Sequence, residues 1–117
     1  IVVATPEPTS LTDAYATIKV LVNQQKRQNV RMVINQTARL GDGRAITMQL
    51  QQVLDRFVVS EPGKPVRLIH MGDIPADPSV RQAIMRRQLL MQSMPGCPAA
   101  MAVTQVAIKL QEALLPR

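Results

Sequence analysis

Residues 1–21, IVVATPEPTSLTDAYATIKVL, contain the pattern that decides the fold of this chain. An apolar run opens the stretch, a proline-rich turn follows, and apolar side chains then recur at the three- and four-residue spacing of a helix. The pattern predicts a buried strand and then a helix over residues 10–27. Ser10 is the expected N-cap of this helix, and Asp13, three residues on, would complete a capping box.

Two further apolar runs, residues 30–35 and 66–74, alternate with helical patterns. Continuous apolar character is typical of parallel strands that are covered on both faces, and the alternation indicates β-α-β units. The turn residues 60–65 should end the helix between these two runs. The side chains expected on the buried face of that helix are Ile46, Leu50, Val53, Leu54, Phe57 and Val58.

Prolines mark the later helix boundaries. Asp77 followed by Pro78 predicts an N-cap and a first helical residue, with a short helix ending at Arg86 or Arg87. Residues 95–98 break the chain, and Cys97 is expected to cap the last helix, over residues 99–115. The face of that helix expected to pack on the sheet consists of Val103, Val106, Ala107, Leu110 and Leu114.

These elements predict an α/β fold with a partial parallel sheet of about three strands and crossover helices, in a single partial domain over residues 1–117. A parallel sheet of this size would leave two open edges, which proteins usually avoid. We therefore expect further strands to precede Ile1.

Composition excludes several classes of function. A single cysteine rules out an internal disulfide and a cysteine-rich metal site, and no run approaches the roughly 20 apolar residues of a membrane span. The net charge of +6 favours an anionic partner, yet with one Phe, one Tyr and no Trp the chain lacks the aromatic platforms that bind single-stranded nucleic acid. A cytoplasmic protein is expected, with peripheral contact to the inner face of the membrane left open, and nucleic acid is not the favoured partner.

Four segments, in order along the chain, resemble a known family. They are TPEPTSLTDAY (residues 5–15), VRMVINQ (30–36), GDIPADPSVRQAI (72–84) and SMPGCPAAMAV (93–103). All four are similar to segments of the MinD/ParA family of deviant P-loop ATPases, in particular the flagellar-number regulators of the FlhG/FleN type; Cys97 stands where that family usually has Ser. The resemblance covers nearly the whole chain and implies the C-terminal half of a MinD-like P-loop NTPase fold.

The resemblance also implies site residues. It assigns contact with a nucleotide base to Asn35, Pro75 and Asp77. This assignment is chemically reasonable, because Asn offers both a donor and an acceptor to a base edge, and ligands of open α/β sheets bind beyond the carboxyl ends of the strands. The resemblance further suggests a face for contact between subunits, with the candidates Glu7, Thr9 and Asp13.

For the parent protein the resemblance implies ATP and magnesium as cofactors, ATP hydrolysis, a homodimer, and control of flagellar number and placement at the cytoplasmic face of the membrane. Its implied partners are a flagellar SRP-type GTPase and a flagellar transcription activator. The five glycines of this chain never form the phosphate-binding pattern G-x-x-x-x-G-K-[ST]. We therefore assign no catalytic residue and no metal ligand, and we expect neither hydrolysis nor tight nucleotide binding from this chain alone.

Two alternatives remain open. One is a non-catalytic basic module that binds DNA or an acidic protein through Arg27, Arg31, Arg81, Arg86 and Arg87. The other is a different MinD/ParA branch, serving cellulose secretion, pilus assembly or partitioning. His70, the only histidine, has no patterned metal or catalytic partner and is interpreted as a histidine of the core or of a strand end.

Overall fold

A computed structural model describes residues 1–57 and 65–115, so the interpretation of Val58 and of most of the predicted turn at residues 60–65 falls outside the described residues. The elements follow in the order β1 (Val2–Ala4), α1 (Pro8–Gln25), β2 (Asn29–Thr37), α2 (Asp42–Phe57), β3 (Arg67–Pro75), α3 (Pro78–Met85), α4 (Leu90–Ser93) and α5 (Pro98–Leu114). The predicted alternation of strands and helices is confirmed.

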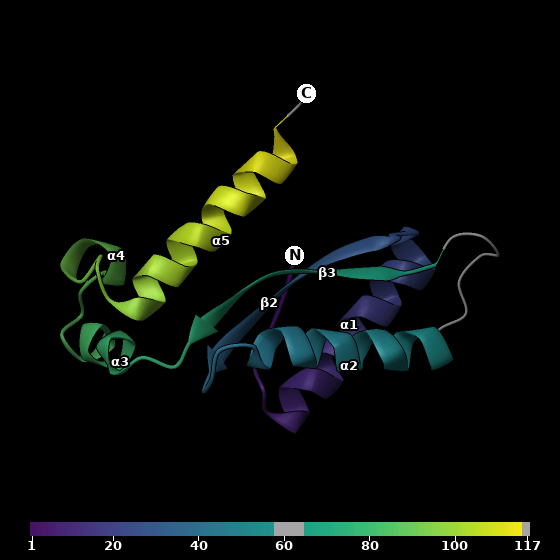
Figure 1. Cartoon of the computed structure of the whole chain (residues 1–117), viewed down its shortest axis with the longest axis horizontal. Coiled ribbons are helices and arrows are strands. Elements are labelled where there is room, and N and C mark those ends of the chain that lie inside the picture. The colour runs from purple at the N-terminus through teal and green to yellow at the C-terminus, as the bar shows by residue number, and fades with distance from the viewer. Residues whose placement is uncertain (58–64, 116–117) are drawn as a thin grey trace.

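The three strands form a parallel sheet in the order β1-β2-β3, with a helix in each connection between neighbours. In Figure 1, α1 and α2 lie on one side of this sheet, while α5 lies on the other side, next to β3. This arrangement confirms the predicted α/β class with a three-stranded parallel sheet and crossover helices.

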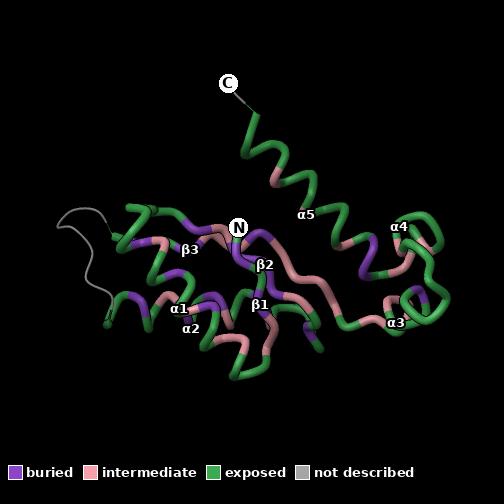
Figure 2. The backbone as a smooth tube through the Cα atoms, turned by 180° about the vertical axis from the view of Figure 1, so that it is seen from behind, coloured by how far each residue is buried: buried purple, intermediate pink, exposed green. Residues whose placement is uncertain are grey.

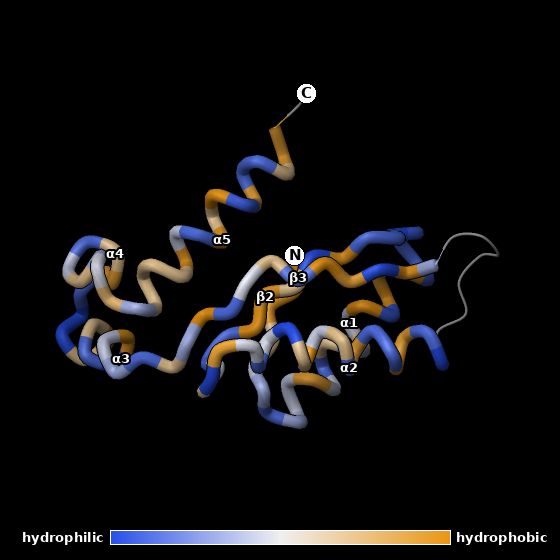
Figure 3. Tube along the Cα trace, viewed as in Figure 1, coloured by the Kyte–Doolittle hydropathy of each residue, from blue (hydrophilic) through white to orange (hydrophobic). Residues whose placement is uncertain are grey.

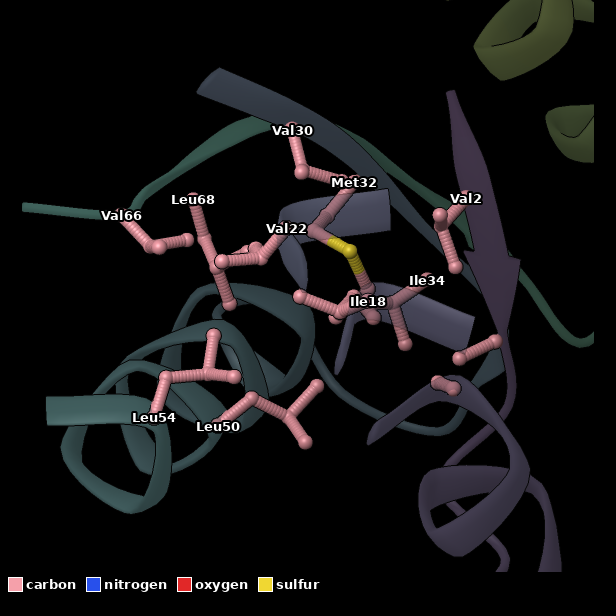
Figure 4. Close-up of a cluster of buried hydrophobic side chains, with 12 residues drawn as sticks. Val2, Ile18, Val22, Val30, Met32, Ile34, Leu50, Leu54, Val66 and Leu68 are labelled. Atoms are coloured by element: carbon pink, nitrogen blue, oxygen red, sulfur yellow. The ribbon is translucent and has the colours of Figure 1, made fainter. Parts of the chain in front are cut away.

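The main core lies between the sheet and the two crossover helices, as Figure 4 shows. Alternate residues of β2 point to the same face of the sheet, so Val30, Met32 and Ile34 all face α1 and α2. Met32, Ile34 and, from α1, Ile18 have no exposed surface. Burial of these aliphatic side chains is the main force that holds the sheet and the two helices together.

The opposite face of the sheet is only partly covered. At the start of α5, Ala99 and Ala100 are buried, and the Lys109 ammonium donates a hydrogen bond to the Met71 carbonyl at 3.2 Å. The rest of α5 is largely exposed (Figure 2). Of the face of α5 that was expected to pack on the sheet, Val106 and Leu110 are half-buried, so the prediction is correct for these two residues. It is wrong for the face as a whole, because Val103, Ala107 and Leu114 are exposed.

Two predictions about helices α1 and α2 are wrong. Helix α1 begins at Pro8 with Glu7 as its N-cap, because proline suits the first helical turn. The hydroxyl of Ser10 instead accepts a hydrogen bond from the Thr5 amide at 2.9 Å, and the expected capping box does not form. In α2, the expected buried residues Val53 and Phe57 are 39% and 64% exposed.

Helix α4 was not predicted, since a single helical turn is too short to show a periodic pattern. Among the described residues, no helix is both long enough and apolar enough to cross a lipid bilayer.

Candidate functional site

The carboxyl ends of β2 and β3 bring two of the sequence-predicted base-contact residues together. Asn35 is the register partner of Ile74, and Thr37 is the partner of Pro75. The pairing continues beyond the strands, because the Ala76 amide donates to the Thr37 carbonyl at 2.9 Å. Asn35 and Pro75 therefore lie on adjacent strands at the edge where open parallel sheets bind their ligands.

Local backbone geometry sets the position of Asn35. A register shift separates Asn35 from Thr37, and the intervening Gln36 has a left-handed conformation with φ of 59°. The Gln36 amide donates to Asn35 Oδ1 at 2.9 Å, which fixes the half-buried side chain against its own turn. An asparagine side chain has a second lone pair on Oδ1 and two N–H donors, so hydrogen-bonding capacity for a base edge remains.

Asp77 connects two helices. One carboxylate oxygen accepts from the Ser79 amide at 2.9 Å, and the other accepts from the Ala99 amide at 3.0 Å. These two donors, Ala99 above all, lower the pKa of Asp77 below its ordinary value. The predicted N-cap of α3 is confirmed, and the structure adds a second bond, to the first turn of α5. Both oxygens thus serve the fold, and Asp77 positions the loop after Pro75.

The candidates for subunit contact lie at this same edge of the sheet. Helix α1 begins only a few residues after the carboxyl end of β1, so its first turns lie near the carboxyl ends of the strands. Glu7, Thr9 and Asp13 are exposed there. Glu7 is the N-cap residue of α1, but its side chain makes no capping hydrogen bond.

Sequence reasoning missed a polar cluster between α2 and β3. Asp73 Oδ2 accepts from the Gly43 amide at 3.0 Å, and Asp73 Oδ1 lies 2.7 Å from Nε2 of His70. Nδ1 of His70 lies 3.2 Å from the Thr47 hydroxyl, which in turn contacts the Gly43 carbonyl at 2.9 Å. The contacts close a ring of four residues, which we call the His70 ring: Gly43, Thr47, His70 and Asp73. It attaches the start of α2 to β3 just before Ile74.

Burial and the neighbouring charges have opposing effects on the pKa of His70. Burial lowers the pKa of His70 below its ordinary value, and the Asp73 carboxylate opposes that shift. The positive charges of Arg44 and Lys109 lower this pKa further. His70 was interpreted as a histidine of the core or of a strand end; it lies inside β3 and is partly buried, and its partners were not foreseen.

Comparison with known proteins finds two similar flagellar proteins. No family model matches the chain. Over 116 residues, 99% of its length, the chain is 34% identical to the antiactivator FleN of Pseudomonas aeruginosa. The chain thus resembles the MinD/ParA family of flagellar regulators. The chain is also 26% identical, over 107 residues, to the flagellum site-determining protein YlxH of Helicobacter pylori. It spans 39% of the length of FleN and 34% of the length of YlxH.

The arginines of the alternative basic-module hypothesis do not form one patch. Arg27 precedes β2 at the amino ends of the strands, whereas Arg81 belongs to α3, which follows the carboxyl end of β3. A nine-residue strand such as β3 is roughly 30 Å long at about 3.3 Å per residue. Arg27 and Arg31 therefore lie near the amino ends of the strands, whereas Arg81, Arg86 and Arg87 lie beyond their carboxyl ends.

Replacement of Asp77 with asparagine tests the double role of its carboxylate. The asparagine side chain keeps one acceptor oxygen, but its NH2 group takes the place of the other oxygen and so places a donor opposite a backbone N–H donor. We expect the melting temperature at neutral pH to fall by several degrees, whereas Asp13→Asn, an exposed aspartate on α1, should leave it unchanged. Because the folded pKa is lowered, the wild-type carboxylate stabilises the fold above about pH 4 and loses this effect as pH falls through the folded pKa. The melting temperature of Asp77→Asn should therefore change less with acid pH than that of the wild type. If Asp77→Asn and Asp13→Asn had the same pH dependence, the stabilising role of the Asp77 carboxylate would be contradicted.

Proposed function

We propose that this chain supplies a wall for the nucleotide base and part of the dimer face of an ATP-dependent regulator of flagellar number and placement. The observation that carries the proposal is the register of β2 and β3, which aligns Asn35 with Ile74 and Thr37 with Pro75. The similarity to FleN over 99% of the chain supports the flagellar assignment.

The residues at this edge fit an adenine base. The proline ring offers a flat apolar wall, and Asn35 retains both a donor and an acceptor for the polar edge of the base. Asp77 holds α3 and α5 in place around the loop and so orients Pro75. ATP, with magnesium, would supply the phosphates whose hydrolysis resets the regulator. The 117 residues contain no phosphate-binding G-x-x-x-x-G-K-[ST] pattern, so the share of this chain is binding and orientation.

Glu7, Thr9 and Asp13 would form part of the subunit contact. ATP would favour the dimer, and hydrolysis would favour separate subunits, a shift in population between two states. The proposed partners are a flagellar SRP-type GTPase and a flagellar transcription activator, and the proposed location is the cytoplasm, with peripheral association at the inner face of the membrane. The exposure of the three side chains at the start of α1 is compatible with this role.

Asn35→Ala tests the base wall in the natural protein. Loss of a hydrogen bond to the base should weaken ATP binding about tenfold, since a buried partner left unpaired costs about 1–3 kcal/mol. Displacement of a fluorescent ATP analogue would measure this. Tripolyphosphate, which lacks a base, should compete equally well against the wild type and the variant.

The matched control is Asn23→Ala, which removes an exposed asparagine on α1. It should change the affinity for neither competitor. If Asn35→Ala weakened ATP and tripolyphosphate to the same extent, the residue would act on the phosphates or on the fold, and the assignment to the base would be wrong.

A further inference from the structure

The α3–α4 lobe, residues 78–97, projects beyond the end of the sheet (Figure 1). Its basic side chains are Arg81, Arg86 and Arg87, all exposed, and it contains no acidic residue. The nearest carboxylate in the chain, Asp77, already accepts hydrogen bonds from two backbone amides. The three guanidinium groups therefore form a local excess of positive charge.

The same lobe exposes bulky apolar side chains. Ile84 and Met85 at the end of α3 are 69% and 75% exposed, and Leu89 and Met91 around α4 are 66% and 43% exposed. Figure 3 shows hydrophilic and hydrophobic segments adjoining one another through this region. Exposed apolar patches bordered by polar or charged residues occur at sites of interaction.

A hollow of about 390 Å³ runs along α3. Its lining residues are spaced as one helical stripe and comprise Pro78, Arg81, Gln82, Met85 and Arg86. Methionine is flexible and polarizable and adapts to different apolar side chains, and arginine binds carboxylates with two parallel hydrogen bonds. The hollow can therefore receive an apolar side chain while arginines on its rim bind acidic neighbours.

Backbone hydrogen bonds hold the lobe in a defined shape. The Gln88 amide donates to the Ala83 carbonyl at 2.9 Å and the Arg87 amide to the Ile84 carbonyl at 3.1 Å, which closes the end of α3. The Met94 amide donates to the Leu90 carbonyl at 2.9 Å. A backbone fixed in this way loses little conformational entropy on binding.

We infer that the α3–α4 lobe is a docking surface for an acidic amphipathic segment of a partner protein. The charge of the lobe selects acidic side chains, and its hollow and exposed methionines receive the apolar ones. Neither α3, with eight residues, nor α4, with four, offers the long apolar face by which helices lie in a membrane interface. The residues that line the hollow are not those of the proposed base wall, so the test needs no nucleotide.

The first test measures binding of the natural protein to a synthetic helical peptide with leucines on one face and glutamates on the other. Arg81→Glu/Arg86→Glu should weaken binding at least tenfold, and added salt should weaken binding to the wild type. The matched control, Lys19→Glu/Arg27→Glu, lowers the net charge by the same amount at exposed positions on and just after α1 and should bind as the wild type does. Equal losses in both double variants would show an effect of net charge alone and would overturn the inference.

A second pair of variants tests the lobe with substitutions that should not destabilise the fold. Arg87 and Lys26 are basic residues with left-handed backbone, φ of 53° and 56°, a conformation that glycine adopts more easily. Arg87→Gly and Lys26→Gly should therefore melt no lower than the wild type, while only Arg87→Gly should weaken binding of the peptide, by about threefold. A peptide with lysines in place of the glutamates should not bind. Binding to vesicles of phosphatidylcholine and phosphatidylglycerol, without binding to the acidic peptide, would show that the lobe binds a membrane and not a protein, and would contradict the inference.

Discussion

Replacement of Gly43 with alanine is expected to lower the free energy of unfolding by about 2 kcal/mol. A Cβ atom on Gly43 would overlap the carboxylate of Asp73, so the carboxylate must leave the position where it accepts from the Gly43 amide. A hydrogen bond to a charged group contributes about 1.5–3 kcal/mol, and the better helix propensity of alanine offsets at most about 1 kcal/mol of its loss. Denaturant unfolding at neutral pH would measure the difference.

A double-mutant cycle identifies the clash with Asp73 as the cause. In an Asp73→Ala background the clash is gone, so Gly43→Ala should cost almost nothing there, and the two single changes should be strongly non-additive. Gly96→Ala is the control, because a Cβ at Gly96 meets no atom within 4 Å. Additive effects of the two substitutions would show that Gly43 is required for a reason other than Asp73.

The imidazole of His70 gives an independent readout of the same substitution. The Asp73 carboxylate raises the pKa of His70 against the effect of burial, so displacement of this carboxylate should lower that pKa further. An NMR titration of the single histidine would follow the change. Because β3 continues from Asp73 directly into Ile74 and Pro75, Gly43→Ala should also disturb the proposed base wall and reduce ATP affinity in the natural protein.

Those parts of the fold that depend on local chemistry were predictable from the sequence. Continuous apolar runs indicated three parallel strands, and Asp77 before Pro78 indicated a helix start, since both signals act within a few residues. The N-cap of α1 was predicted at Ser10 but is Glu7. Both residues lie close to the first apolar residue of the helix, and Pro8, which lies between them, determines where the helix begins. The pairing of Asn35 with Ile74 could be expected only as a consequence of strand order, because its register depends on the whole sheet.

The His70 ring could not be predicted because it depends on an irregularity in β3. In a regular strand, residues three apart point to opposite faces. Here Met32 pairs with His70 while Val33 pairs with Gly72, so Met71 is an extra residue, and Asp73 then pairs with Ile34. The bulge turns His70 and Asp73 to the same face, the one that carries α2. No spacing rule for helices or strands would have placed these two side chains together.

Ile18→Ala is expected to have the largest effect on stability, about 3–4 kcal/mol. Ile18 is fully buried at the middle of α1 and packs into the cluster of Figure 4 that contains Met32 and Ile34. Truncation to alanine removes apolar contacts and leaves a cavity, which the surrounding residues of the sheet can fill only in part. Ile18→Val, which removes one methylene, should cost about 1 kcal/mol on the same measurement.

Val20→Ala on the same helix separates this core effect from a change of helix propensity. Val20 is 47% exposed, and its truncation should change the free energy of unfolding by no more than about 0.5 kcal/mol. If Ile18→Ala cost no more than Val20→Ala, α1 would not pack on the sheet as described. The packing matters for function, because the buried residues Ala14, Ile18 and Val22 attach α1 to the sheet and thereby hold the candidate contact residues Glu7 and Thr9 at the edge where Asn35 lies.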